Sequence, residues 1–204
     1  KFKTVALSGE AEGSDAYRVT VTVDKDAKKL IISDNGIGMT AEEIDKYINQ
    51  IAFSGASEFL AKYKDENDDS AQIIGHFGLG FYSAFMVADS VEIDSLSYQS
   101  GAKAAKWVCD GSMEFDMSEG ERTERGTTIT LNVAEDSKEF LEEFKIREIL
   151  RKYCAFLPVE IYLENANEPE KEAKDESEKP EPKPINDTNP LWMKKPSECT
   201  DEEY

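Results

Sequence analysis

The chain has 204 residues, of which 43 are acidic and 24 are basic, so its formal net charge is −19. This excess of acids, together with the lack of any basic run longer than two residues, argues against a nucleic-acid partner. No stretch approaches the roughly 20 apolar residues of a membrane-spanning helix, and no secretory signal follows the opening Lys1-Phe2-Lys3. We therefore expect a cytoplasmic protein that binds neither nucleic acid nor membrane.

The three cysteines, Cys109, Cys154 and Cys199, are far apart and form no CxxC pair. An odd number of widely spaced cysteines is typical of reduced thiols rather than of a disulfide framework or a zinc site.

Strand and helix periodicities alternate along the first four fifths of the chain. Strands are predicted, in chain order, at 17–23, 30–32, 91–98, 104–109, 112–117, 127–133 and 159–163, the first two as a hairpin and those from 91 to 133 as a meander. A capping box at Thr40–Glu43 predicts a helix start, and a second helix is expected from about Ser137 to just before Pro158. The pattern predicts an α+β fold, a two-layer sandwich with helices covering one face of a mostly antiparallel sheet.

Composition changes sharply after residue 163. The segment 168–183 has no large apolar residue, so it cannot bury enough surface to offset the entropy of ordering. We therefore expect a folded domain at 1–163, a flexible charged linker at 164–188 and the start of a further domain at 189–204. Because the chain does not begin with Met, we also expect it to be a piece of a longer protein.

The sequence Asp34-Asn-Gly36-Ile-Gly38-Met39 follows a predicted strand and precedes the capped helix. An aspartate at this point can accept a hydrogen bond from an amino group such as that of adenine, and the glycines allow a flat ligand to approach the backbone. The alternative is a strand-to-helix turn that needs glycine only for its conformation.

A second glycine-rich segment, Gly75-His-Phe-Gly78-Leu-Gly80-Phe81, precedes an apolar run that continues to Val87. Backbone N–H groups at such a helix start can bind phosphate, although the same glycines could instead form a hinge. His76 is the only histidine, and no GxSxG motif is present, so a hydrolytic triad is not supported. Gly126-Thr127 at the start of a strand could contribute a hydroxyl to a ligand, which is by itself a weak signal.

Taken together, DNGIGMT, IAFSGASEFL, IIGHFGLGFYSAFMVAD and ERGTTITL resemble the ATP-binding domain of the ninety-kilodalton heat-shock chaperones, in particular its bacterial branch. This family shares a superfamily with DNA gyrase B, sensor histidine kinases and the MutL proteins. The resemblance implies an ATP-dependent chaperone that helps client proteins to fold, takes part in the stress response, uses ATP or ADP with Mg²⁺, and works as a homodimer.

The resemblance also implies roles for individual residues. Asp34 would bind adenine, Gly38 and Thr127 would share the water network around the base, and Met39 would pack on it. The phosphates would lie on a loop made of Gly75, His76, Phe77, Gly78, Leu79, Gly80 and Phe81. A lid would extend from Ile51 to about Gln72.

Two departures from the family pattern limit this assignment. Phe53 stands where many relatives carry lysine, and Tyr47 stands near a ribose contact. The helix bearing the general-base Glu and the Mg²⁺-binding Asn would precede Lys1, so we assign no catalytic or metal residue to residues 1–204 and expect these residues alone to be inactive as an ATPase. Two alternatives remain, a gyrase-type or kinase-type ATPase and a non-enzymatic protein-interaction module.

Overall fold

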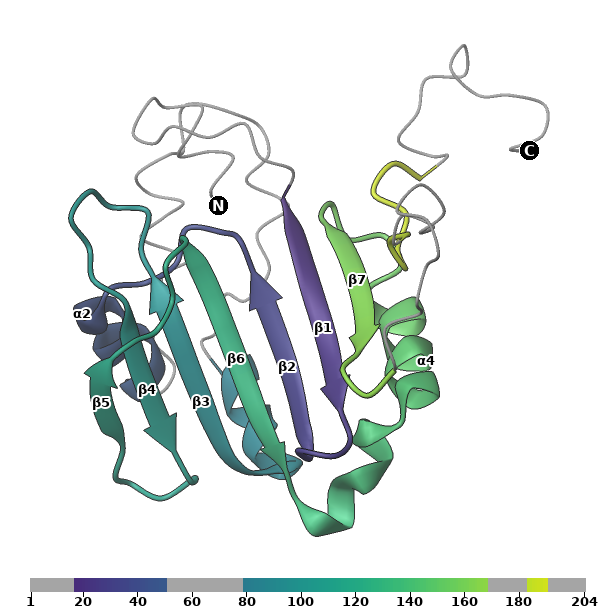
Figure 1. Ribbon diagram of the computed structural model, residues 1–204, viewed down its shortest axis with the longest axis horizontal. Coiled ribbons are helices and arrows are strands. Elements are labelled where there is room, and N and C mark those ends of the chain that lie inside the picture. The colour runs from purple at the N-terminus through teal and green to yellow at the C-terminus, as the bar shows by residue number, and fades with distance from the viewer. Residues whose placement is uncertain (1–16, 51–78, 169–182, 191–204) are drawn as a thin grey trace.

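The computed structural model describes residues 17–50, 79–168 and 183–190. These residues form a seven-stranded sheet with helices against one of its faces (Figure 1). The strands are β1 (Arg18–Asp24), β2 (Lys29–Asp34), β3 (Ala88–Leu96), β4 (Ala105–Cys109), β5 (Asp116–Glu119), β6 (Gly126–Val133) and β7 (Glu160–Asn165). The order across the sheet is β5-β4-β3-β6-β2-β1-β7, and only β1 and β7 are parallel. The predicted α+β class is therefore confirmed.

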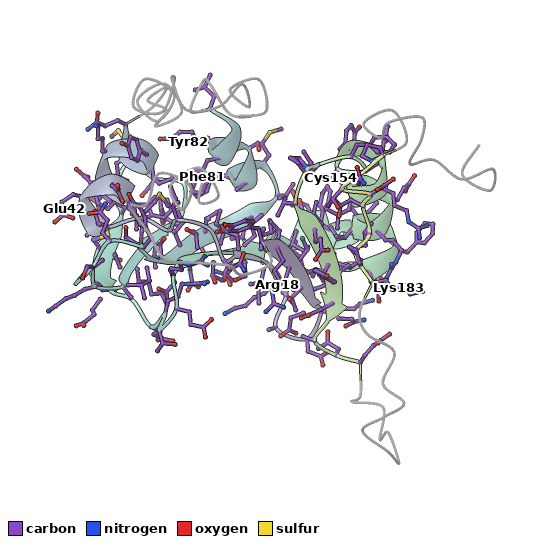
Figure 2. The ribbon with its side chains drawn as sticks, turned by 90° about the horizontal axis from the view of Figure 1, so that it is seen from above. Arg18, Glu42, Phe81, Tyr82, Cys154 and Lys183 are labelled. Atoms are coloured by element: carbon purple, nitrogen blue, oxygen red, sulfur yellow. The ribbon has the colours of Figure 1, made fainter. Side chains whose placement is uncertain are left out.

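The helical elements that the structure describes are short apart from one. They are α2 (Ala41–Ile44), the π-helix η1 (Asp45–Asn49), the 3₁₀ helices η3 (Gly80–Met86) and η4 (Glu135–Leu141), and α4 (Glu143–Tyr153). Seen from above, Glu42, Phe81 and Tyr82 lie on the same side of the sheet, and none of the helices that the structure describes covers the other face (Figure 2).

The predicted hairpin and capping box are confirmed. β1 and β2 pair antiparallel, with Asp24 accepting a hydrogen bond from the Ala27 amide at 2.9 Å in the turn. At the start of α2 the Thr40 hydroxyl accepts from the Glu43 amide, and the Glu43 carboxylate accepts from the Thr40 amide. Both features involve neighbouring residues only, which is why sequence reading finds them.

Three predicted details are wrong. The strand expected at 112–117 begins at Asp116, because Gly111 adopts φ +86° and Asp110 accepts from the Ser112 amide, which makes a turn. The helix expected from Ser137 is divided, because the backbone of Glu142 is extended between η4 and α4. The meander predicted from 91 to 133 would place β6 beside β5, but β6 lies between β3 and β2. The strand β5, with four exposed residues, forms the edge of the sheet instead.

The core lies between the helices and two rows of apolar side chains that run across the central strands. Residues directly opposite one another on neighbouring strands face the same side of a sheet, so the register defines each row. One row holds Val23, Leu30, Leu131, Val91 and Cys109, and the next holds Val21, Ile32, Ile129, Ile93 and Trp107. α4 contributes the buried Ile146 to the same core.

Candidate functional site

The third row of the helix-covered face differs from the two apolar rows. It runs Val19, Asp34, Thr127, Ser95 and Ala105, so three neighbouring strands each present a polar side chain at the same level. Ser95 is fully buried and Thr127 is 8% exposed. Polar groups at such positions cost free energy unless they are hydrogen-bonded, and the network around Ser95 supplies the bonds.

Ser95 connects this row to the turn that follows β2. Its hydroxyl accepts from the Met39 amide at 2.8 Å, donates to the Gly126 carbonyl at 3.1 Å, and lies 2.8 Å from the Thr127 hydroxyl. A serine hydroxyl has one donor and two acceptor positions. With the donor used on Gly126 and one acceptor used on Met39, the remaining acceptor position suits a proton from Thr127.

Asp34 is the charged member of the row. Burial raises the pKa of its carboxyl group, while the backbone amides of Gly36 and Thr127 and the positive charge of Arg122 act in the opposite direction. The Gly36 amide donates to Oδ1 at 2.7 Å. An ionised carboxylate accepts hydrogen bonds only, so this group suits a ligand that presents an N–H donor.

The turn after Asp34 requires glycine at one position. Gly38 is buried with φ +63°, and a Cβ atom there would lie 1.8 Å from the carbonyl oxygen of Leu96. The Tyr98 amide donates to the Ile37 carbonyl at 2.8 Å, which holds the turn against the end of β3. This close approach places Met39 beside Ser95, at the edge of the apolar core.

The predicted phosphate loop is described only at its end. Gly75, His76, Phe77 and Gly78 lie outside the described residues, as do Phe53 and the lid predicted from Ile51 to Gln72. Leu79 is half exposed, and no atom lies within 4 Å of a Cβ built on Gly80. Phe81 instead packs inward, with its ring 5.7 Å from that of Trp107.

The two elements on either side of residues 51–78 are tied to the sheet and to each other. The Tyr82 hydroxyl in η3 donates to the Ile48 carbonyl in η1, and the Trp107 indole on β4 donates to the Asn49 side chain at 2.8 Å. Tyr47 is half-buried in η1, where the Lys46 ammonium lies 5.2 Å from its ring centre. Polar contacts thus hold η1 and η3, the described elements before and after residues 51–78.

The structure brings together Asp34, Gly38, Met39 and Thr127, four of the residues predicted from the sequence. Sequence reasoning missed Ser95, which is the hub of the network, and the arginines Arg122 and Arg125, which contact the backbone next to Asp34. A signal for Ser95 existed: the alternation of Val91 and Ile93 assigns the next core position to it, and a serine there interrupts an apolar series.

Comparison with known proteins identifies the family. Residues 11–140 match the family described as histidine kinase-, DNA gyrase B-, and HSP90-like ATPases. The chain belongs to this family. Its seven-stranded sheet with helices on one face agrees with that membership.

Among members of this ATPase family, the chain is similar to chaperones named HtpG. It is 55% identical over 206 aligned residues to Chaperone protein htpG of Bacteroides fragilis strain 638R and 54% identical to that of Bacteroides thetaiotaomicron. It is 48% identical over 205 residues to the HtpG of Porphyromonas gingivalis. Each alignment covers the whole chain and 29% of the relative, so the chain spans less than a third of the length of these proteins.

The described residues, 17–50, 79–168 and 183–190, contain neither a membrane-spanning helix nor a metal-binding cluster. None of their helices is long and apolar enough to cross a membrane. Within the same ranges, no group of three or more His, Cys, Asp and Glu side chains could hold a metal ion.

Proposed function

We propose that this chain forms the adenine-nucleotide site of an ATP-dependent chaperone that assists the folding of client proteins. The observation that carries the proposal is the polar row of Asp34, Thr127 and Ser95, which lies beside two rows that are apolar from β1 to β4 across the sheet. Adenine combines a flat apolar ring with an exocyclic amino group, and this combination of surfaces suits such a site. The names of the HtpG relatives support the chaperone assignment.

Each residue of the row would have a distinct task. The Asp34 carboxylate would accept a hydrogen bond from the amino group of adenine, and Thr127 would contact the ring through its hydroxyl or through water. Gly38 lets the turn lie against β3, and Met39 offers an apolar surface for the ring. Because ionised acceptors make stronger hydrogen bonds than neutral ones, the aspartate would contribute most to the recognition of the base.

The phosphates would extend towards the glycine loop from Gly75 to Phe81, and the segment from Ile51 to Gln72 would close over them. The support for this part is the sequence pattern and the polar anchoring at Tyr82 and Asn49. Backbone amides of a glycine-rich loop are suited to anionic phosphate oxygens.

We propose that hydrolysis in the natural protein uses a glutamate that the family resemblance assigns to the segment before Lys1. Of the two candidates next to the turn, Glu43 binds the Thr40 amide at 2.8 Å and the Gln99 side chain at 3.4 Å, while Glu42 is exposed on α2. These contacts occupy the Glu43 carboxylate and disfavour it as a general base, because such a base must reach the attacking water. Residues 1–204 alone would then show no measurable ATPase activity.

The described residues provide no ligand cluster that fits Mg²⁺. Magnesium in nucleotide sites is held largely by the phosphates and by water, with few protein ligands. The remaining parts of the proposal are a homodimeric protein, unfolded or partly folded clients, and a cytoplasmic location, with no nucleic-acid or membrane partner.

Calorimetric titration with ADP tests the proposed site in the natural protein that carries this chain. The wild type should bind, and Asp34→Ala should reduce the affinity at least tenfold, since hydrogen bonds to charged groups contribute about 1.5–3 kcal/mol. Asp26→Ala, in the exposed turn between β1 and β2, serves as the matched control. Binding that is absent in the wild type, or unchanged in Asp34→Ala, would refute the proposal.

A further inference from the structure

Two arginines hold the backbone that follows the Asp34 side chain. Both belong to the loop between β5 and β6, some 90 residues away in sequence. Arg122 donates to the Asp34 carbonyl at 3.2 Å. Arg125 donates to the carbonyls of Asn35 and Gly36, the latter at 3.4 Å. Three successive carbonyl groups of the DNG sequence are thus bound by guanidinium groups.

The guanidinium group of Arg122 is fully occupied by the chain. It donates to the Glu124, Arg125 and Asp34 carbonyls at 3.2 Å, to the Ser33 hydroxyl at 3.2 Å and to the Thr128 hydroxyl. A guanidinium group has five N–H donors, and these are five acceptors. Arg122 lines a hollow of about 720 Å³ on the sheet face opposite to the polar row, but its donors are already engaged there. Its role is therefore to hold the chain rather than to capture an anion.

Gly126 brings this loop against the end of β2. A Cβ atom at Gly126 would lie 2.1 Å from the Asp34 carbonyl oxygen and 2.8 Å from the Arg122 guanidinium group. Its φ of +124° also disfavours other residues. The next residue is Thr127, directly opposite Asp34 in the sheet, so one short segment supplies both a wall of the site and the support behind it.

We propose that Arg122 and Arg125 are positioning residues that fix the direction of the Asp34 carboxylate and thereby set the preference of the site for adenine. This inference rests on the proposed function, in which Asp34 receives the amino group of the base. Ser33 and Thr128, the side chains that Arg122 contacts, occupy the alternate positions of β2 and β6 and face away from the polar row. Arg122 therefore acts through the backbone from the opposite face, and Arg125 acts through the Asn35 and Gly36 carbonyls that it binds.

A carboxylate that accepts one specific hydrogen bond must be positioned to within a fraction of an ångström. The backbone that carries the carboxylate must therefore be fixed as well. The pairing between β2 and β6 ends at Asp34 and Thr127. Among the described residues, strand pairing therefore no longer fixes the backbone after Asp34. Arginine is suited to this task because its planar fork offers several donors in a fixed geometry, whereas lysine offers one flexible charge.

The test compares ADP with inosine diphosphate, which carries a carbonyl oxygen in place of the amino group that Asp34 would bind. Wild-type protein should prefer ADP. In Arg122→Gln and Arg125→Gln the affinity for ADP should fall about tenfold, the size expected for one charge-assisted hydrogen bond, with a smaller change for inosine diphosphate. The ratio of the two affinities should fall accordingly. Arg122→Lys, which keeps the charge, should give an intermediate ratio, and Arg151→Gln on the exposed side of α4 is the matched control.

Thermal unfolding of each variant separates positioning from general stability. If a glutamine variant does not fold at the assay temperature, the ratio of ADP affinity to inosine diphosphate affinity is measured on the corresponding lysine variant instead. The proposal is overturned if folded variants keep the wild-type ratio, or if they lose affinity for both nucleotides equally. A wild type that binds neither nucleotide would instead refute the proposed function itself.

Discussion

The hydroxyl groups of Ser95 and Thr127 lie 2.8 Å apart on the neighbouring strands β3 and β6. Both residues are buried, and their strand neighbours on the same face are apolar. The Ser95 hydroxyl also accepts a hydrogen bond from the Met39 amide in the turn after β2. One hydroxyl therefore joins three segments that are far apart in sequence, and it contacts the Thr127 hydroxyl next to Asp34.

Replacing Ser95 by alanine should destabilise the protein, because the partly buried Met39 amide loses its acceptor. We expect a loss of about 1–3 kcal/mol in the free energy of unfolding, measured by urea denaturation, and weaker binding of ADP. Ser118→Ala on the exposed strand β5 should change neither quantity. Equal stability of Ser95→Ala and the wild type would show that another acceptor replaces the hydroxyl.

The raised pKa of Asp34 predicts a pH dependence of stability with a defined sign. The folded state favours the protonated carboxyl group, so the cost of burying its charge is present above the folded-state pKa and disappears as the pH falls towards the ordinary value of 3.8. The free energy of unfolding of the wild type, relative to that of Asp34→Asn, should therefore increase as the pH falls from above the folded-state pKa towards 3.8, by about 1.4 kcal/mol for each pH unit between the two pKa values.

Parallel urea titrations of the wild type and of Asp34→Asn at several pH values measure this difference. In the same range ADP should bind more weakly as the pH falls, because the neutral carboxyl group is a poorer acceptor than the carboxylate. A difference in stability that stays constant with pH would mean that the Asp34 pKa is the same in the folded and unfolded states.

Gly38→Ala should be far more harmful than Gly101→Ala, although both glycines have positive φ. At Gly101 (φ +79°) a Cβ atom would meet nothing within 4 Å, so only the backbone cost of about 1–2 kcal/mol applies. At Gly38 the new atom would overlap the Leu96 carbonyl at 1.8 Å and displace the turn that carries Met39. Thermal unfolding and ADP titration of both variants give the comparison, and similar melting temperatures would contradict it.

Asn186 should stabilise the outer edge of β7. Its buried side chain accepts from the Ile161 amide at 2.8 Å and donates to the carbonyls of Leu157 and Val159 at 2.9 and 2.7 Å. Asn186→Ala leaves these groups without partners, so we expect a loss of at least 1–3 kcal/mol, roughly the cost of one buried group left unpaired, and faster hydrogen exchange at the Ile161 amide. Asn189→Ala, at an exposed position, is the control, and unchanged exchange at Ile161 would refute the role.

The contacts of Asn186 also bear on the domain division. β7 extends to Asn165, and the Ile185 amide donates to the Ile161 carbonyl at 2.8 Å, so both ends of the predicted 164–188 linker contact the folded domain. The division into 1–163, 164–188 and 189–204 stays a prediction.

The sequence by itself determined the features that depend on near neighbours. Alternation identified β1, β2 and the faces of the central strands, Thr40 and Glu43 identified the start of α2, and the spacing of Asp34, Gly36 and Gly38 identified the turn. In each case the interacting groups lie within a few residues, so the local pattern contains the whole physical cause.

Only the tertiary structure decided which distant segments meet. The insertion of β6 between β3 and β2 placed Thr127 opposite Asp34. The same holds for Ser95 as the hub and for Arg122 behind Asp34, whose side chains look like ordinary strand and loop residues in the sequence. The hydrogen bonds that join these distant segments span 31 to 89 residues, and a contact over such a distance exists only once the whole sheet has formed.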